Sequence, residues 1–68
     1  MASQSEIYRI LPTNPLHAID VKQMATILDD PIGRTNYSRR LASLRRDKRV
    51  DHRDIVENHH ARRVWWRL

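Results

Sequence analysis

No cysteine occurs among the 68 residues of this chain, so no disulfide, thiolate zinc finger or cysteine nucleophile can form. The same absence favours a cytoplasmic chain over a small secreted one. A domain of this size buries only about 60% of the surface that its unfolded chain exposes, which disfavours a large active-site cavity. We therefore expect residues 1–68 to form one domain held together by packing, with no cofactor and no standalone enzymatic activity.

Basic residues are concentrated in the second half of the chain. Residues 1–33 contain two basic and four acidic residues, whereas residues 34–68 contain eleven basic and four acidic residues. Eleven of the 13 basic residues are arginines, whose planar guanidinium matches phosphates and guanine edges. Because the sequence has no apolar run near 18 residues and no lipidation motif, we expect neither a membrane span nor an anchor. The basic half therefore favours nucleic acid as the partner, and a nucleoid location if the source is prokaryotic or viral.

Two capping-box patterns predict short helices in the first half. Ser3 with Glu6 begins the first helix, and Asp20 with Gln23 begins a second helix over about residues 20–28. The apolar stripes at helical spacing are Ile7, Ile10 and Leu11 in the first helix, and Val21, Met24, Ala25 and Leu28 in the second. Between the helices, residues 16–19 form an extended link that can supply one short strand.

A third helix is predicted over residues 35–48. Its narrow apolar stripe consists of Tyr37, Leu41 and Leu44. A turn over residues 29–33 precedes it, because Pro31 disfavours a helical Asp30 and Gly33 tolerates positive φ. Alternatively, Pro31 occupies the first position of the third helix with Asp30 as its cap.

A β-hairpin is predicted after Arg49, where the helical period ends. The alternating residues are Val64, Trp66 and Leu68 on one face and Arg63, Trp65 and Arg67 on the other. With residues 58–60 as a three-residue turn, the predicted pairs are Val50 with Leu68, His52 with Trp66 and Val56 with Arg62. This register places Trp66 in the core, leaves Ile55 pointing away from it, and leaves Trp65 exposed.

The order of these elements resembles that of winged helix-turn-helix DNA-binding domains, such as small regulators of the ArsR and MarR kind. The resembling segments are residues 21–28 for the positioning helix, 37–44 for the recognition helix and 62–68 for the return strand of the wing. The resemblance implies an α+β fold with three helices followed by a C-terminal hairpin wing. The chain departs from the pattern at Lys48 or Arg49, where a small residue or glycine is usual.

The resemblance implies binding of double-stranded DNA, with the third helix in the major groove and the wing on the backbone. The candidate DNA-binding residues are Arg34, Thr35, Asn36, Ser38, Arg39, Arg40, Ala42, Ser43, Arg45, Arg46, Lys48, Arg62 and Arg63. Arg39 is the first candidate for a guanine contact. Arg62 and Arg63 are expected to reach phosphates or the minor groove. We expect a role in transcription regulation or a related DNA transaction, and no effector is assigned.

Other interpretations stay open from the sequence. The arginine-rich helix face can be a solvated surface paired with Asp47, Asp51 and Asp54. The tryptophan-bearing hairpin can dock a protein partner, or Trp65 can stack on RNA. A homodimer through the first helix or Trp65 fits such a small module. Three histidines (His52, His59 and His60) do not complete a zinc ligand set, so no metal is expected.

Overall fold

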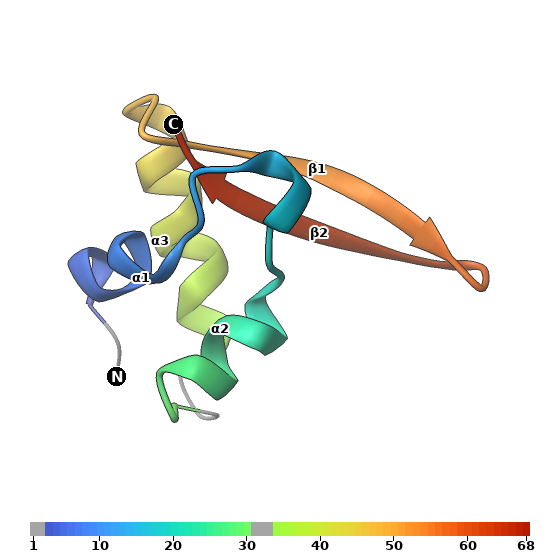
Figure 1. Ribbon diagram of the computed structural model, residues 1–68. Helices are drawn as coiled ribbons and strands as arrows, with labels where there is room; N and C mark the ends of the chain where they lie inside the picture. The colour runs from blue at the N-terminus through green and yellow to red at the C-terminus, as the bar shows by residue number, and fades with distance from the viewer. Residues whose placement is uncertain (1–2, 31–33) are drawn as a thin grey trace.

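The computed structural model describes residues 3–30 and 34–68, and only the backbone of residues 34 and 35. Its elements are helix α1 (Gln4–Ile10), the 3₁₀ turn η1 (Pro15–His17), helix α2 (Val21–Ile27), helix α3 (Arg34–Arg46), and strands β1 (Val50–Glu57) and β2 (His60–Arg67). The strands form a two-stranded antiparallel sheet, which gives the predicted α+β arrangement of three helices followed by a hairpin. The helices gather beside one end of the hairpin, and its turn extends away from them (Figure 1).

The two predicted capping boxes are present and begin α1 and α2. The backbone amide of Glu6 donates to Ser3 Oγ at 3.2 Å, and the amide of Ser3 donates to Glu6 Oε1 at 3.4 Å. Asp20 and Gln23 form the same pair of bonds at 2.8 and 3.0 Å. Each box satisfies two amides that lack a partner within the helix, so these four residues fix where the helices start.

The core lies where the three helices meet the base of the hairpin. Its buried residues are Ile7, Leu11, Met24, Ala25, Tyr37, Leu41, Leu44, Val50 and Trp65. Every residue of the predicted third stripe is buried, while Ile10, Val21 and Leu28 pack around the cluster and are partly buried. The helical periodicity therefore identified the core faces of all three helices.

The buried hydroxyl of Tyr37 joins α3 to the end of α2. It donates to Asp30 Oδ2 at 3.3 Å. Burial raises the pKa of Tyr37, and the negative charge of Asp30 raises it further. The phenol thus stays protonated and keeps its role as a donor at neutral pH.

Helices α2 and α3 end in the same hydrogen-bond pattern. The amide of Asp30 donates to the carbonyl of Ala25 at 2.9 Å, and the amide of Arg49 donates to the carbonyl of Leu44 at 3.0 Å. The preceding residues, Asp29 and Lys48, have φ of 52° and 60°. This is the Schellman arrangement, in which glycine usually takes the left-handed position. The Schellman arrangement ends α3 at Arg46, two residues before the predicted end. Pro31 and Gly33, which belong to the predicted turn before α3, lie outside the described residues.

The predicted register of the hairpin is wrong by one residue. The turn contains only Asn58 and His59, whose φ values are 50° and 66°, and His60 already belongs to β2. Positive φ at both central residues is the type I′ geometry, which matches the twist of the flanking strands. The observed pairs are Val50 with Arg67, His52 with Trp65, and Val56 with Ala61.

The register shift exchanges the two tryptophans between the faces of the hairpin. Trp65 is 5% exposed and belongs to the core, whereas Trp66 is half-buried on the other face. The predicted positions of both residues are therefore wrong, because a slip of one residue moves every side chain of a strand to the opposite face. Ile55 is half-buried on the face away from the helices, as expected.

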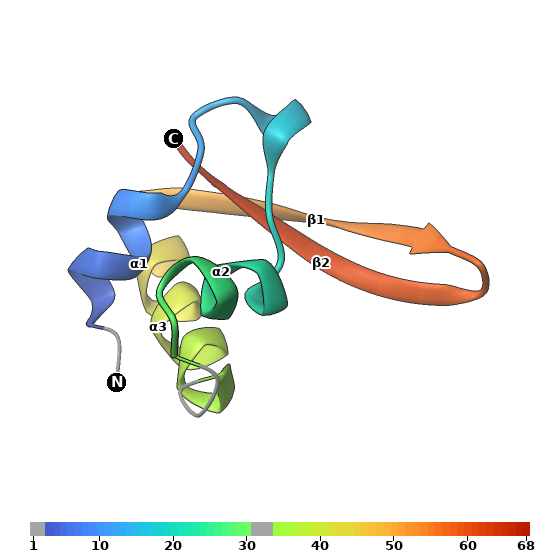
Figure 2. The same cartoon turned by 60° about the horizontal axis from the view of Figure 1, so that its bottom comes forward.

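The segment between α1 and α2 packs on the face of the hairpin opposite the helices (Figure 2). The predicted strand over residues 16–19 is reduced to one residue, because Asn14 caps η1 and turns the chain at Leu16. Ile19 alone pairs with β2, through two hydrogen bonds to Trp65 of 3.1 and 2.8 Å. Val64 lies on the same face of the hairpin as this segment, and it is 1% exposed.

We expect His59→Gly to raise the free energy of unfolding by about 1 kcal/mol, because glycine removes the cost of a left-handed backbone. Ala61→Gly is the matched control and should lower it by about 0.5–1 kcal/mol, because Ala61 lies in a strand. Urea denaturation measures both values. Destabilisation by His59→Gly would contradict the two-residue turn.

We expect Trp65→Leu to lower the free energy of unfolding by about 2–3 kcal/mol, because it opens a cavity in the core. Trp66→Leu should cost clearly less, since this side chain is half-buried. Denaturation monitored by circular dichroism gives both values. Equal or reversed costs would favour the register predicted from the sequence.

Candidate functional site

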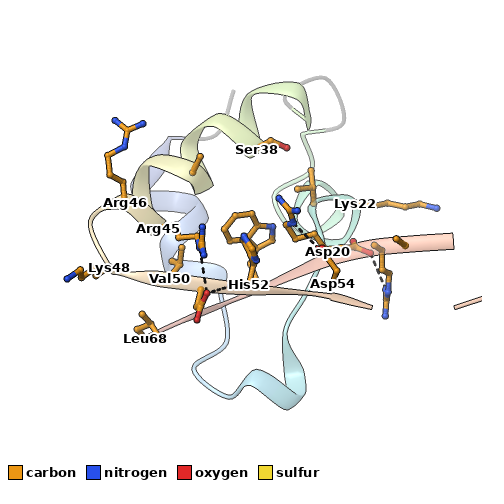
Figure 3. Close-up of a pocket in the computed structure, with 17 residues that line it drawn as sticks. Asp20, Lys22, Ser38, Arg45, Arg46, Lys48, Val50, His52, Asp54 and Leu68 are labelled. Carbon is orange, nitrogen blue, oxygen red and sulfur yellow. Dashed lines mark hydrogen bonds and ion pairs between the residues drawn. The ribbon is translucent and has the colours of Figure 1, made fainter. Parts of the chain in front are cut away.

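A groove lies between α3 and the hairpin, and we call it the helix–hairpin groove (Figure 3). Its α3 wall carries Ser38, Ala42, Arg45 and Arg46, and further lining residues are Asp20, Val21, Lys22, Lys48, Val50, Asp51, His52, Asp54, Ala61, Arg62, Arg63, Trp65 and Leu68. The four α3 residues follow each other at helical spacing, so one exposed flank of α3 faces the groove. Residues far apart in the sequence thus line one concave surface.

Basic side chains outnumber acidic ones in the groove by six to three. Arg62 Nη1 lies 3.1 Å from Asp20 Oδ2, and Arg63 Nε lies 2.9 Å from Asp54 Oδ1. Arg45 Nε is 3.7 Å from an oxygen of Asp51. The acidic side chains therefore partly neutralise the hairpin arginines and one arginine of α3. Of the partners considered from the sequence for the helix arginines, Asp51 pairs with Arg45, whereas Asp54 pairs with Arg63 of the hairpin.

Three other basic residues of the groove keep their charge uncompensated. Lys22, Arg46 and Lys48 are exposed and form no ion pair with any residue that the structure describes. Arg46 and Lys48 lie at the C-terminal end of α3, and Lys22 lies in the first turn of α2. The charges of these three residues are therefore available to an anion without breaking an ion pair within the described part of the chain.

The predicted site residues divide between two sides of α3. The helix–hairpin groove contains Ser38, Ala42, Arg45, Arg46, Lys48, Arg62 and Arg63. The remaining described residues, Asn36, Arg39, Arg40 and Ser43, line a separate depression beside Gln4 of α1. Arg39 is exposed there rather than between α3 and the hairpin. The side chains of Arg34 and Thr35 lie outside the described residues.

Sequence reasoning missed several groove residues, and three of them are Asp20, Lys22 and His52. Asp20 was read only as a helix cap, yet it also binds Arg62 across 42 positions of sequence. Lys22 had no local signal that places it beside the hairpin. His52 stands edge-on to Trp65, with ring centroids 4.6 Å apart and an interplanar angle of 86°. Its position follows only from the corrected register.

The contact between Arg63 and Asp54 shifts the ionisation of both groups. The hydrogen bond from Arg63 lowers the pKa of Asp54 below its ordinary value of 3.8, and the charges of Arg63 and His52 lower it further. The same hydrogen bond raises the pKa of Arg63 above its ordinary value. Both groups therefore stay charged throughout the physiological pH range.

Two other features, a cluster of metal ligands and a membrane-spanning helix, are absent from the described residues. Across residues 3–30 and 34–68, no three His, Cys, Asp or Glu side chains come together as metal ligands. No helix in this part of the chain is long and apolar enough to cross a membrane.

No family model matches the chain, and neither the curated proteins nor the solved structures contain a match.

We expect Arg63→Gln to raise the pKa of the Asp54 carboxyl toward 3.8, because it removes the hydrogen bond and the charge that favour the carboxylate. The stabilising contribution of this pair is present above the ordinary aspartate pKa and is lost as pH falls through the lower pKa of folded Asp54. Carboxyl-detected NMR titration measures the shift. An unchanged Asp54 pKa in Arg63→Gln would contradict the contact.

Proposed function

We propose that the protein is a winged helix-turn-helix module that binds double-stranded DNA. In this proposal α2 and α3 are the helix-turn-helix, α3 is the recognition helix, and the β1–β2 hairpin is the wing. The observation that carries the proposal is the helix–hairpin groove, in which an exposed flank of α3 and the hairpin share one surface with surplus positive charge. A major groove about 12 Å wide admits one helix of this kind.

The exposed side chains of α3 suit contact with base edges. Ala42 and Ser38 are exposed and small, so the helix can approach the bases closely at these positions. Arg46 continues the same flank and offers a guanidinium with no ion pair among the described residues, which suits a bidentate guanine contact or a phosphate. Arg39 can add a contact from the other flank of α3.

The hairpin arginines suit the backbone of the duplex. The side chains of Arg62 and Arg63 are 43% and 53% exposed, and their partners Asp20 and Asp54 are 18% and 55% exposed. Exposed pairs such as Arg63 with Asp54 contribute only about 0–1 kcal/mol, so exchange of this carboxylate for a phosphate has a small cost. These residues would therefore add affinity with little sequence preference. A regulator of transcription built from two copies of such a module would read two half-sites.

The groove favours DNA over a partner that docks through Trp65 or stacks on it. Trp65 is 5% exposed and packs in the core, so it offers too little free surface for either contact. Trp66 remains as the half-buried tryptophan that a protein partner could reach. Trp66 does not line the helix–hairpin groove, so variants can separate the two functions.

Binding to fluorescent duplex DNA across a salt series tests the proposal. We expect the logarithm of the association constant to fall with the logarithm of salt concentration with a slope between about −3 and −6. Arg46→Gln should reduce the size of that slope by about one, because one phosphate or base contact loses its cation.

Arg53→Gln is the matched control. It removes the same charge from β1 on the opposite face, where Arg53 Nη2 contacts the carbonyl of Pro15 at 3.5 Å. We expect this variant to bind DNA as the unaltered protein does. Absence of binding at low salt, or equal losses in the two variants, would overturn the proposal. Loss of a protein partner in Trp66→Ala with DNA binding absent would favour the docking function.

A further inference from the structure

A second group of basic side chains lies around Tyr8, away from the helix–hairpin groove. It lines a depression formed by α1, the end of α3 and the open end of the hairpin. The lining residues are Gln4, Ser5, Tyr8, Arg9, Leu44, Arg49 and Arg67, none of which lines the groove. We call Arg9, Arg49 and Arg67 with Tyr8 the Tyr8 cluster.

Two of these guanidinium groups lie over the ring of Tyr8. Arg67 Cζ lies 5.4 Å from the centroid of Tyr8, and Arg49 Cζ lies 5.7 Å from it. Arg67 Nε also donates to the carbonyl of Leu11 at 2.8 Å, which fixes the orientation of its guanidinium. The amide of Leu68 donates to the carbonyl of Arg49 at 2.9 Å, so the two arginines extend from adjoining ends of the hairpin. The cluster is therefore assembled by the fold.

The Tyr8 cluster lacks the acidic partners found in the helix–hairpin groove. None of its lining residues is acidic, and Arg9 and Arg49 form no ion pair with any residue in the described part of the chain. Arg49 and Arg67 lie over one ring and Arg9 lines the same depression, so these like charges repel each other, and the ring offsets only part of that repulsion. An anion bound between them would remove the repulsion and gain charge-assisted hydrogen bonds.

We propose that the Tyr8 cluster binds a phosphate group. Phosphate fits better than a carboxylate, because it carries more negative charge and offers three oxygens to guanidinium forks. Ser5 adds a hydroxyl donor at the same depression. The phosphate belongs either to a second DNA duplex, which would make the protein a bridge between duplexes, or to a free phosphate compound. The bridging form rests on the proposed DNA binding, whereas the phosphate site does not.

The first experiment titrates the full chain with inorganic phosphate and follows the arginine Nε–Hε signals by NMR. We expect the signals of Arg49 and Arg67 to shift with phosphate and not with chloride at equal ionic strength. Arg49→Gln should weaken phosphate binding roughly tenfold, because one charge-assisted contact is lost. Arg53→Gln, on the far face of the hairpin, should leave it unchanged. Equal shifts with chloride, or an unchanged affinity in Arg49→Gln, would overturn the proposal.

The second experiment identifies the source of the phosphate. An immobilised duplex is saturated with protein, and capture of a second, fluorescent duplex is measured. Capture that Arg49→Gln abolishes, while its affinity for a single duplex is kept, supports a second duplex as the ligand. Phosphate binding without capture supports a free phosphate compound. If Arg46→Gln no longer binds DNA but still binds phosphate, phosphate binding at the Tyr8 cluster does not depend on DNA binding through the helix–hairpin groove.

Discussion

Two hydrogen bonds between Ile19 and Trp65 join the segment before α2 to the hairpin. They fasten the segment that leads into α2 to the central part of β2, so the start of α2 and the hairpin cannot move independently. The next residue, Asp20, caps α2 and also binds Arg62 of the hairpin. The ring of Trp65 enters the core beside α3. The Ile19–Trp65 pairing, the hydrogen bond from the Arg67 amide to the carbonyl of Pro12 and the shared core together place the hairpin beside α3 and so form the helix–hairpin groove.

The two basic surfaces differ in how their charges are balanced. In the helix–hairpin groove, carboxylates hold Arg62, Arg63 and Arg45 in place before any ligand arrives. Exposed pairs of this kind add little stability, so their value lies in orientation. In the Tyr8 cluster, Arg49 and Arg67 lie over an aromatic ring instead of beside carboxylates. The ring is uncharged, so the positive charge of the two guanidinium groups is not neutralised. A ligand that contacts Arg45, Arg62 or Arg63 must displace an acidic partner, whereas no residue that lines the depression of the Tyr8 cluster is acidic.

Local signals in the sequence predicted most of the helical part of the fold. The capping boxes and apolar stripes depend on residues three or four positions apart, so they could be read without knowing the tertiary structure. The hairpin register depended on whether His60 belongs to the turn, and no local signal excluded a three-residue turn. The sequence also could not show that Arg39 lies outside the helix–hairpin groove, beside a separate depression. Periodicity identifies the buried face of a helix, but only tertiary packing determines which exposed flank meets the hairpin.

The residues with a left-handed backbone bear on the stability of the fold, and one of them, Lys48, also bears on the proposed function. Asp29, Lys48, Asn58 and His59 all have positive φ, and no glycine takes such a position in the described part of the chain. At the end of α3, glycine would remove a conformational cost of about 1–2 kcal/mol. Lys48 instead places an uncompensated cation at the mouth of the helix–hairpin groove. The backbone position that lowers the stability of this helix end therefore also adds positive charge to the groove on which the proposed DNA binding rests.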